Sequence, residues 1–321
     1  GYTAALRSLC SVIFICCSVF SVAVTVRPAV GIERTNGTPA ESDTPAPDTQ
    51  STDVQDADKP SEGADDGTDG ESKIVSADLS AESAFEFSNE TKYKFDPQAI
   101  IGAGYPIEAQ TTDEPSVLIL HSHATECYTE PGAEVVTDTR SSDPKKNMVA
   151  VGEAAAQAMR ESGVGVIHIE TLFDKDDYNS AYENSRKAAE QCLKENPGIR
   201  YVIDIHRDAL QYENGSMVKT SARLNGEAAA QVMLVVGTNE GGADHPGWTT
   251  NLCVALRLQQ AMCAADENWV RPVNLRRASF NQQYAPGAFL LEIGTCANTL
   301  DEAKTAAREF GRIFAGLIKN P

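Results

Sequence analysis

The sequence predicts an α/β fold built on a single, mostly parallel, twisted sheet with helices on both faces. Short apolar runs of strand length alternate in an orderly way with longer segments of helical periodicity. The helical segments end at residues that stop helices, such as Gly163 and the pair Pro197 and Gly198. Because repeated alternation of strands and helices requires crossover connections, the strands are expected to run mainly in parallel between two helical layers.

The predicted elements begin at about residue 115 and occupy roughly 200 residues. Strands are expected at residues 117–120, 164–169, 201–205, 232–236 and 288–293, and helices at 147–162, 179–196, 249–265 and 300–318. His168, inside one of these strands, is expected to be a buried core histidine. In open sheets of this kind, ligands bind beyond the carboxyl ends of the strands, so the polar side chains there are the first candidates for a functional site.

Residues 9–26 are 18 residues without a charge, and as a helix they would extend about 27 Å, close to the thickness of a bilayer core. This length favours a membrane anchor. A secretory signal stays open, because Ser21, Val22 and Ala23 form a small-x-small cleavage pattern. We therefore expect residues 1–30 to be a membrane anchor or a signal segment.

The acidic residues concentrate in one tract rather than in the predicted domain. Residues 41–90 hold 15 Asp and Glu against two Lys, a net charge of −13, whereas the rest of the chain carries −6 of the total of −19. The tract has few large apolar residues, so burial cannot offset the entropy lost on ordering it. We expect residues 31–114 to be a disordered acidic linker with a short ordered portion near its end, and residues 115–321 to form the folded domain.

The remaining composition excludes some kinds of site. The sequence has no glycine-rich phosphate loop and no basic helix with interleaved aromatic residues, so nucleotide or nucleic-acid binding is not expected. Five cysteines lie in the domain, at Cys127, Cys192, Cys253, Cys263 and Cys296. Their number is odd and no pair has a C-x-x-C spacing, so we expect packed thiols, with one disulfide possible but not assignable, and no cysteine zinc site.

Histidines and one glutamate occur where three predicted strands end. His121 and His123 follow the strand at 117–120, His206 follows the strand at 201–205, and Glu292 lies one residue before the end of the strand at 288–293. His123 and Glu126 have an H-x-x-E spacing, which places an imidazole and a carboxylate on the same side of a tight turn. The sequence therefore predicts Zn²⁺ held by His123, Glu126 and His206, with a fourth position for water.

Glu292 is the candidate general base, because a carboxylate in an apolar strand needs either a catalytic role or a charged partner. A structural glutamate paired with an arginine is the alternative. Three roles stay open for His121: direct ligation, orientation of a ligand from behind, or capping of the strand. Asp204 and Asp208 flank His206 and the arginine after it, and are expected to fix the imidazole tautomer, hold the arginine or serve the loop.

With these residues in place, the chain resembles the stage II sporulation protein P family, zinc-dependent N-acetylmuramoyl-L-alanine amidases of endospore-forming bacteria. The resemblance runs from about residue 116 to residue 317. It is carried by segments in the same order at residues 121–126, 147–152, 178–182, 202–209, 235–238, 245–248, 281–282, 290–295 and 298–299. Several such segments in one order are far more specific than the H-x-x-E spacing alone.

The resemblance implies a membrane-anchored peptidoglycan hydrolase that cuts the amide between N-acetylmuramic acid and L-alanine of the stem peptide. It implies a single-pass protein of the sporulation septum with its catalytic domain outside the cytoplasm. The protein would act in septal wall remodelling and engulfment with stage II sporulation proteins D and M, and members of the family are also described as cutting peptide crosslinks. The implied fold is the amidase-type, phosphorylase/hydrolase-like α/β domain.

Residue by residue, the resemblance implies His123 and His206 as zinc ligands, Glu126 as the carboxylate ligand and Glu292 as the general base. Further residues of the matching segments are candidates for substrate binding or for support of the ligands: His121, Arg207, Asn281 and Gln282. Two other functions stay open. A zinc carboxypeptidase or endopeptidase would be distinguished by its products, and a non-catalytic wall-binding scaffold would bind no zinc.

Overall fold

The computed structural model of the protein describes residues 72–107 and 114–321. The segment expected to be a membrane anchor or signal, and the first part of the expected linker, lie outside these residues. Within residues 72–107 and 114–321, no helix combines the length and the apolar character needed to cross a membrane.

Among the described residues, seven strands form the main sheet, in the order β2-β9-β8-β10-β5-β3-β4. From one edge to the other these are β2 (Phe87–Asn89), β9 (Val273–Arg276), β8 (Val232–Gly237), β10 (Gly287–Thr295), β5 (Tyr201–Asp208), β3 (Pro115–Leu120) and β4 (Gly165–His168). β10, β5, β3 and β4 are parallel to one another, and β8, β9 and β2 run the opposite way. The change of direction falls between β8 and β10.

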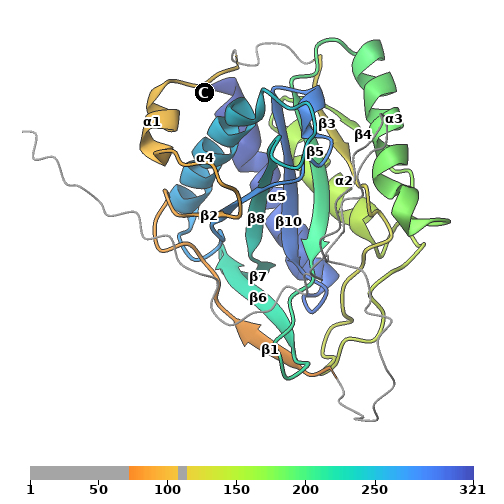
Figure 1. Ribbon diagram of the computed structural model, residues 1–321. Helices are drawn as coiled ribbons and strands as arrows, with labels where there is room; N and C mark the ends of the chain where they lie inside the picture. Colours follow the sequence, from red (N-terminus) through yellow and green to blue (C-terminus); the bar gives the residue numbers. More distant parts are fainter. Residues whose placement is uncertain (1–71, 108–113) are drawn as a thin grey trace, which may run out of the picture.

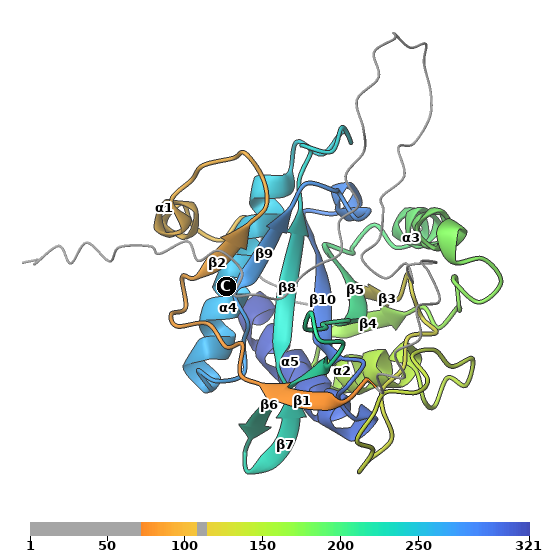
Figure 2. The ribbon, with the colours of Figure 1, turned by 60° about the horizontal axis from the view of Figure 1, so that its bottom comes forward.

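A second sheet of three strands consists of β1 (Ile74–Ala77), β6 (Met217–Leu224) and β7 (Glu227–Ala230). β1 pairs with β6 in parallel, and β6 pairs with β7 in antiparallel. Figures 1 and 2 show this small sheet at one end of the long central strands β8 and β10. The side chain of Thr295, at the end of β10, donates a hydrogen bond to the carbonyl of Val218 in β6 (2.6 Å).

The prediction of a single, mostly parallel sheet is therefore wrong: the described chain has two sheets, and both are mixed. The reason lies between β5 and β8, where the chain has no crossover helix. After β5 it forms the hairpin of β6 and β7 and then enters β8 from the end of the sheet at which β5 finished. Without a crossover, β8 can only run antiparallel to β10.

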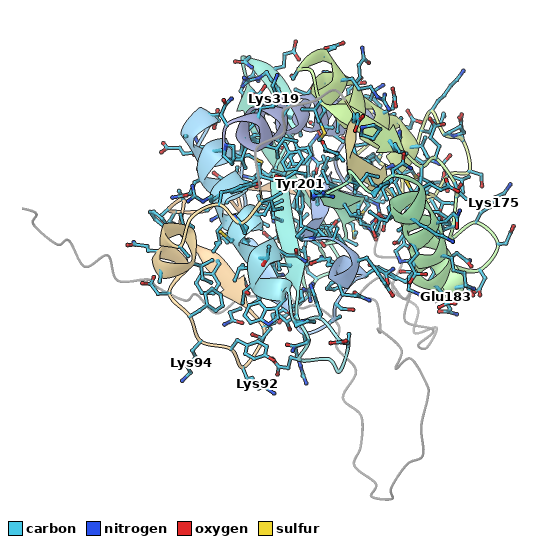
Figure 3. All side chains as sticks on the ribbon, turned by 90° about the horizontal axis from the view of Figure 1, so that it is seen from above. Lys92, Lys94, Lys175, Glu183, Tyr201 and Lys319 are labelled. Atoms are coloured by element: carbon cyan, nitrogen blue, oxygen red, sulfur yellow. The ribbon has the colours of Figure 1, made fainter. Side chains whose placement is uncertain are left out.

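Helices cover both faces of the main sheet, as predicted. α2 (Met148–Glu161), α4 (Trp248–Ala265) and α5 (Leu300–Lys319) pack with Ile119, Ile203 and Leu291 in one large core. α3 (Ala181–Glu195), which follows the short 3₁₀ helix η1 (Tyr178–Ser180), packs against the opposite face, on Leu118 and Val202. Figure 1 shows α3 on the side of the sheet away from α4. In Figure 3, Tyr201 lies in the interior, whereas Lys175 and Glu183 lie at the periphery beside α3.

The folded part begins earlier than predicted. β1, β2 and a short helix, α1 (Pro97–Gly102), lie in the segment that was expected to be a linker with only a short ordered portion near its end. β2 extends the main sheet by pairing with β9, and the ring of Phe87 stacks on that of Phe95 with centroids 4.9 Å apart. This segment is ordered because it pairs with strands that lie far along the chain, a contact that its own composition does not reveal. The described cysteines are free thiols, as expected.

A glycine sets the close approach of α2 and α5. A methyl group added at Gly311 would lie 2.5 Å from the carbonyl oxygen of Ala155 and 3.0 Å from the Cβ of Ala158. We expect Gly311→Ala to lower the free energy of unfolding by about 1–3 kcal/mol, because the backbone of α2 would have to shift.

Gly316 in the same helix is exposed with open space around it. Gly316→Ala is expected to be neutral or to stabilise by up to about 1 kcal/mol through helix propensity. Denaturant unfolding of both variants measures the difference, and equal effects would contradict it.

Candidate functional site

Three neighbouring strands bring the predicted site residues together. β5 lies between β10 and β3, and all three are parallel, so their carboxyl ends meet at one edge of the sheet. In the register of β10 and β5, Glu292 stands directly beside His206. Leu120, at the end of β3, stands beside Asp204, so the turn that carries His123 and Glu126 starts next to the end of β5. The strands that carry these residues are therefore neighbours in the sheet.

The side chains of His123, Glu126 and His206 face one another and are all buried. The rings of His123 and His206 have centroids 5.5 Å apart, at an angle of 78°. Nδ1 of His206 lies 3.5 Å from Oε2 of Glu126. This separation is long for a hydrogen bond and close to the roughly 3.3 Å between two ligand atoms on a tetrahedral ion with bonds of about 2.0–2.1 Å. The residue types, and the spacing of this one pair, are those found around a single divalent metal ion such as zinc.

His206 is held by a carboxylate on its other nitrogen. Nε2 lies 2.9 Å from Oδ1 of Asp204, and Asp204 in turn accepts hydrogen bonds from the backbone N–H (2.8 Å) and the hydroxyl (2.5 Å) of Ser122. The contact between Nε2 and Asp204 is an ion pair without hydrogen-bond alignment, and it leaves Nδ1 on the side of Glu126. A carboxylate behind the imidazole is common at metal-binding histidines.

The electrostatics of the site favour a cation. Burial opposes protonation of His206, but the charges of Asp204 and Glu126 outweigh it and raise the pKa of His206 well above its ordinary value. Burial also opposes ionisation of Glu126, yet the Arg207 guanidinium and the two imidazoles hold the pKa of that carboxyl well below its usual range. Ionised Glu126 is the form that binds a metal ion. A positive charge beside His206 is stabilised whether a proton or a metal ion supplies it.

Glu292 lies on the same face of the sheet as His206, because side chains at paired positions of adjacent strands point the same way. Its Oε2 atom is buried from solvent at the edge where the three strands end. The register therefore places the carboxylate of Glu292 next to His206 at this edge of the sheet.

His121 does not face the other predicted residues. Its Nδ1 lies 2.9 Å from the carbonyl oxygen of Ile205, and its Nε2 lies 2.9 Å from Nε2 of His168. Burial lowers the pKa of His121 to about 3, so the ring is neutral. Because both ring nitrogens have these partners, His121 supports the backbone of β5 next to His206 rather than ligating a metal ion with the others.

The other three candidates, Arg207, Asn281 and Gln282, form hydrogen bonds with the segments around the site. The backbone N–H of Arg207 donates to Oε2 of Glu126 (3.1 Å), and its guanidinium donates to the carbonyls of Cys127 (3.1 Å) and Thr139 (2.9 Å). Arg207 therefore fixes the loop that carries Glu126. Asp208, in contrast, pairs with Arg271 at 2.9 Å.

Gln282 and Asn281 have structural contacts as well. The side chain of Gln282 accepts from the backbone N–H of Gly237 (2.8 Å) and donates to the carbonyl of Val235 (3.1 Å), which secures the end of β8. Asn281 donates to the carbonyl of Tyr182 (2.9 Å). Both residues position their neighbours, and Gln282 is too deeply buried to contact a substrate.

Sequence reasoning missed the residues that surround the histidines. Tyr178 stacks on His123 with centroids 4.3 Å apart, and Tyr182 lies parallel to His206 at 6.3 Å. The guanidinium of Arg140 covers the ring of Tyr178 at 4.6 Å. The two tyrosines are four residues apart at the start of a helix, a spacing that places them on one face. That spacing was the available signal for an aromatic wall beside the site.

Asp174 is a further residue that the sequence did not single out. It is buried, it accepts hydrogen bonds from the backbone N–H (3.1 Å) and hydroxyl (2.5 Å) of Thr125, and it pairs with Arg140 at 2.7 Å. Its Oδ2 lies 3.9 Å from Nδ1 of His123. Asp174 thus fixes the turn between His123 and Glu126.

The same part of the chain is matched by known proteins. The sequence profile of the stage II sporulation protein P family matches residues 26–315. The stage II sporulation protein P of Bacillus subtilis (strain 168) is 28% identical over 222 residues, which are 65% of this chain and 53% of that protein. The chain therefore spans about half the length of this relative.

Solved structures share a more distant likeness. The N-acetylmuramyl-L-alanine amidase Ami1 from Mycobacterium smegmatis is 10% identical, with a TM-score of 0.36, over 66% of this chain and 100% of that one. The CwlD amidase from Clostridioides difficile, solved in complex with the GerS lipoprotein, is 13% identical, with a TM-score of 0.34, over 64% of this chain and 94% of that one. TM-scores of this size say nothing about activity. The family profile, in contrast, extends over most of the chain and includes every residue of the site described above, and this chain belongs to the stage II sporulation protein P family.

Proposed function

We propose that this protein is a zinc-dependent peptidoglycan hydrolase that cleaves the amide between N-acetylmuramic acid and L-alanine of the stem peptide. The observation that carries the proposal is the buried set of His123, Glu126 and His206, in which the centroids of the two imidazole rings are 5.5 Å apart and Nδ1 of His206 lies 3.5 Å from Oε2 of Glu126. Asp204 lies behind this set and Glu292 beside it. Two histidines and a carboxylate with a spare carboxylate nearby are the residues that amide hydrolysis by a zinc enzyme requires. Membership of the family supports the choice of cell-wall peptidoglycan as substrate.

In the proposed mechanism, His123, Glu126 and His206 would hold the metal ion, and the charge of Asp204 behind His206 would stabilise the ligated imidazole. Zinc bound there would supply Lewis acidity, which polarises the scissile carbonyl and makes water easier to deprotonate. Glu292 accepts a proton from the attacking water and delivers it to the amine nitrogen that leaves. The rings of Tyr178 and Tyr182 form a wall that packs against the histidines on one side of the site.

The proposal extends to the place and partners of the protein. Residues 1–30 would anchor it in the membrane, and the catalytic domain would act outside the cytoplasm at the sporulation septum, in wall remodelling and engulfment. Stage II sporulation proteins D and M would act with it. These parts rest on the apolar run at residues 9–26 and on family membership.

Digestion of purified sacculi by the full chain tests the reaction. Mass spectrometry is expected to find free stem peptides that begin with alanine, together with glycan strands whose lactyl groups carry free carboxylates. Single amino acids or peptides cut at their crosslinks, in the absence of these products, would instead identify a zinc carboxypeptidase or endopeptidase. A zinc-free protein that releases nothing from sacculi would identify a non-catalytic wall-binding scaffold.

Asp174 provides a test of how the ligands are positioned. Asp174→Asn keeps the shape of the side chain but removes the charge that pairs with Arg140 and faces His123. We expect zinc affinity to fall by about 10–100-fold, the usual effect of removing a group that orients a metal ligand. Competition with a chelator measures this affinity. Asp176→Asn, at an exposed position nearby, is the matched control and is expected to bind zinc like the wild type. Equal affinities in the two variants would contradict the role of Asp174.

A further inference from the structure

A chain of polar contacts runs from β5 to the surface beside the edge strand β4. It begins at the carbonyl oxygen of Ile205, 2.9 Å from Nδ1 of His121, and continues from Nε2 of His121 to Nε2 of His168 at 2.9 Å. It ends with Nδ1 of His168, 3.2 Å from Oε2 of Glu153 on α2. Figure 1 shows β4 as the last strand of the main sheet, close to α2. The first imidazole of this chain of contacts, His121, lies two residues before His123, but the far end of the chain lies on β4 and α2.

The two imidazoles do not carry enough protons for these contacts. Each of the three contacts joins two atoms that both have lone pairs, so each needs one proton between them. Two neutral imidazoles bring one proton each, and neither the carbonyl of Ile205 nor an ionised Glu153 brings another. If His121 donates to Ile205 and His168 donates to His121, the lone pair of His168 Nδ1 points at the carboxylate of Glu153. In this arrangement of protons, a cation between Nδ1 of His168 and the carboxylate of Glu153 would complete the chain.

That end of the chain has the ligands for a metal ion. Glu153, His168 and Glu170 each offer a ligand atom, and these atoms all lie within 4.8 Å of one another. The side chain of His168 is 1% exposed and that of Glu153 is 47% exposed, so the site opens to solvent on the carboxylate side. Arg160 contacts the other oxygen of Glu153, Oε1, at 3.0 Å, which leaves Oε2 for His168. With two carboxylates and one guanidinium, the group keeps a net negative charge.

We propose that Glu153, His168 and Glu170 form a second metal site that binds a divalent transition-metal ion, with Zn²⁺ as the expected ion. An ion at Nδ1 of His168 satisfies every contact of the chain with two neutral imidazoles. His168 then donates through Nε2 to His121, and His121 donates to Ile205, so a ligating histidine is oriented by a hydrogen bond from its second nitrogen. One nitrogen and two carboxylate oxygens are a donor set that suits zinc.

The backbone of α2 is shaped to admit this pair of rings. A methyl group at Gly152 would lie 2.4 Å from Nε2 of His121 and 2.7 Å from Nε2 of His168. Only glycine leaves room for the two imidazoles to meet beneath the helix. The metal ion would tie β4 to α2 and, through His121, to the carbonyl of Ile205, which precedes His206 in β5. The site is therefore structural and supports the strand that carries a proposed catalytic ligand.

Counting zinc ions in the full chain tests the second site separately from the catalytic one. After equilibrium dialysis against micromolar Zn²⁺, mass spectrometry of the metal is expected to find two ions per wild-type chain. The double variant Glu153→Gln and Glu170→Gln should lose one ion, because each substitution removes a ligand charge at a solvent-accessible side chain. Glu161→Gln combined with Glu195→Gln, at exposed positions on α2 and α3, is the matched control and should keep both. His206→Ala should lose the other ion.

The outcomes separate the two sites. The second site is supported if His206→Ala retains one zinc ion and loses it when Glu153→Gln and Glu170→Gln are added to the same chain. This result would stand even if the catalytic proposal fails. Equal zinc content in the wild type and the Glu153 and Glu170 double variant overturns the second site, and the positive charge that completes the chain of contacts is then a proton on the histidine pair. Circular dichroism of each variant confirms folding, and if the double variant is unfolded, Glu170→Gln alone is expected to weaken the second ion at least tenfold.

Discussion

Replacement of Glu292 by Gln is expected to lower turnover on sacculi by a factor on the order of 10²–10⁴ while the bound zinc stays in place. Glu292 stands beside His206 in the register of β10 and β5, and its Oε2 atom is buried at the edge where the strands end. The amide of Gln has nearly the same shape as the carboxylate but cannot accept a proton from water. Binding of the substrate should therefore persist and the chemical step should fail, so kcat falls much more than KM changes.

The measurement combines turnover, zinc content and thermal unfolding of the same preparations. Glu227→Gln provides the control, because it makes the same substitution at an exposed residue of β7. This control is expected to keep wild-type turnover. A Glu292→Gln variant with full activity and full zinc content would remove Glu292 from the mechanism, whereas a loss of zinc would make it a ligand instead of a base.

His206→Ala is expected to abolish activity and to remove the catalytic zinc. The substitution deletes one of three protein ligands and leaves the buried carboxylates of Asp204 and Glu126 without the imidazole that lies between them. Two remaining ligands hold zinc poorly, since sites that bind it tightly use at least three. The uncompensated carboxylates should also reduce the free energy of unfolding, by a few kcal/mol.

Removal and return of the metal separate the loss of zinc from the loss of fold. A chelator should abolish the activity of the wild type, and added Zn²⁺ should restore it, whereas His206→Ala should stay inactive in the presence of added Zn²⁺. Wild-type activity that survives complete removal of metal would contradict a zinc mechanism. Activity of His206→Ala in excess zinc would show that other residues suffice to hold the ion.

Much of the candidate site followed from the sequence because it depends on strand ends. His123 and His206 each come shortly after an apolar run, and Glu292 lies inside one, so any sheet with these strands as parallel neighbours brings them together. The sequence did not distinguish the direction in which His121 points. Successive residues of a strand face opposite sides, and a turn after the strand can restore or reverse that order. The contacts of His121 with Ile205 and His168 settle the matter.

The sheet was harder to predict because it depends on pairing between distant segments. The hairpin of β6 and β7 did have a local signal, Asn225 followed by Gly226, and both residues have the positive φ angles (51° and 86°) of a tight hairpin turn. The pairing of β2 with β9 had no local signal. Its partner residues, such as Ser88 and Asn274, lie far apart in the sequence. Long-range pairing of short, polar strands leaves almost no trace in composition or periodicity.

The sequence alone determined the order of the nine predicted elements, the presence of helices on both faces, and the set of histidines and carboxylates at the strand ends. These features follow from local periodicity, from helix stops and from residue chemistry, which each segment carries by itself. Only the tertiary structure decided the direction of β8, the recruitment of residues 72–107 into the fold, and the aromatic and acidic surroundings of His123. These three features depend on which distant segments of the chain contact one another. The free energy of such a contact depends on both segments, and no local pattern in the sequence identifies the partner.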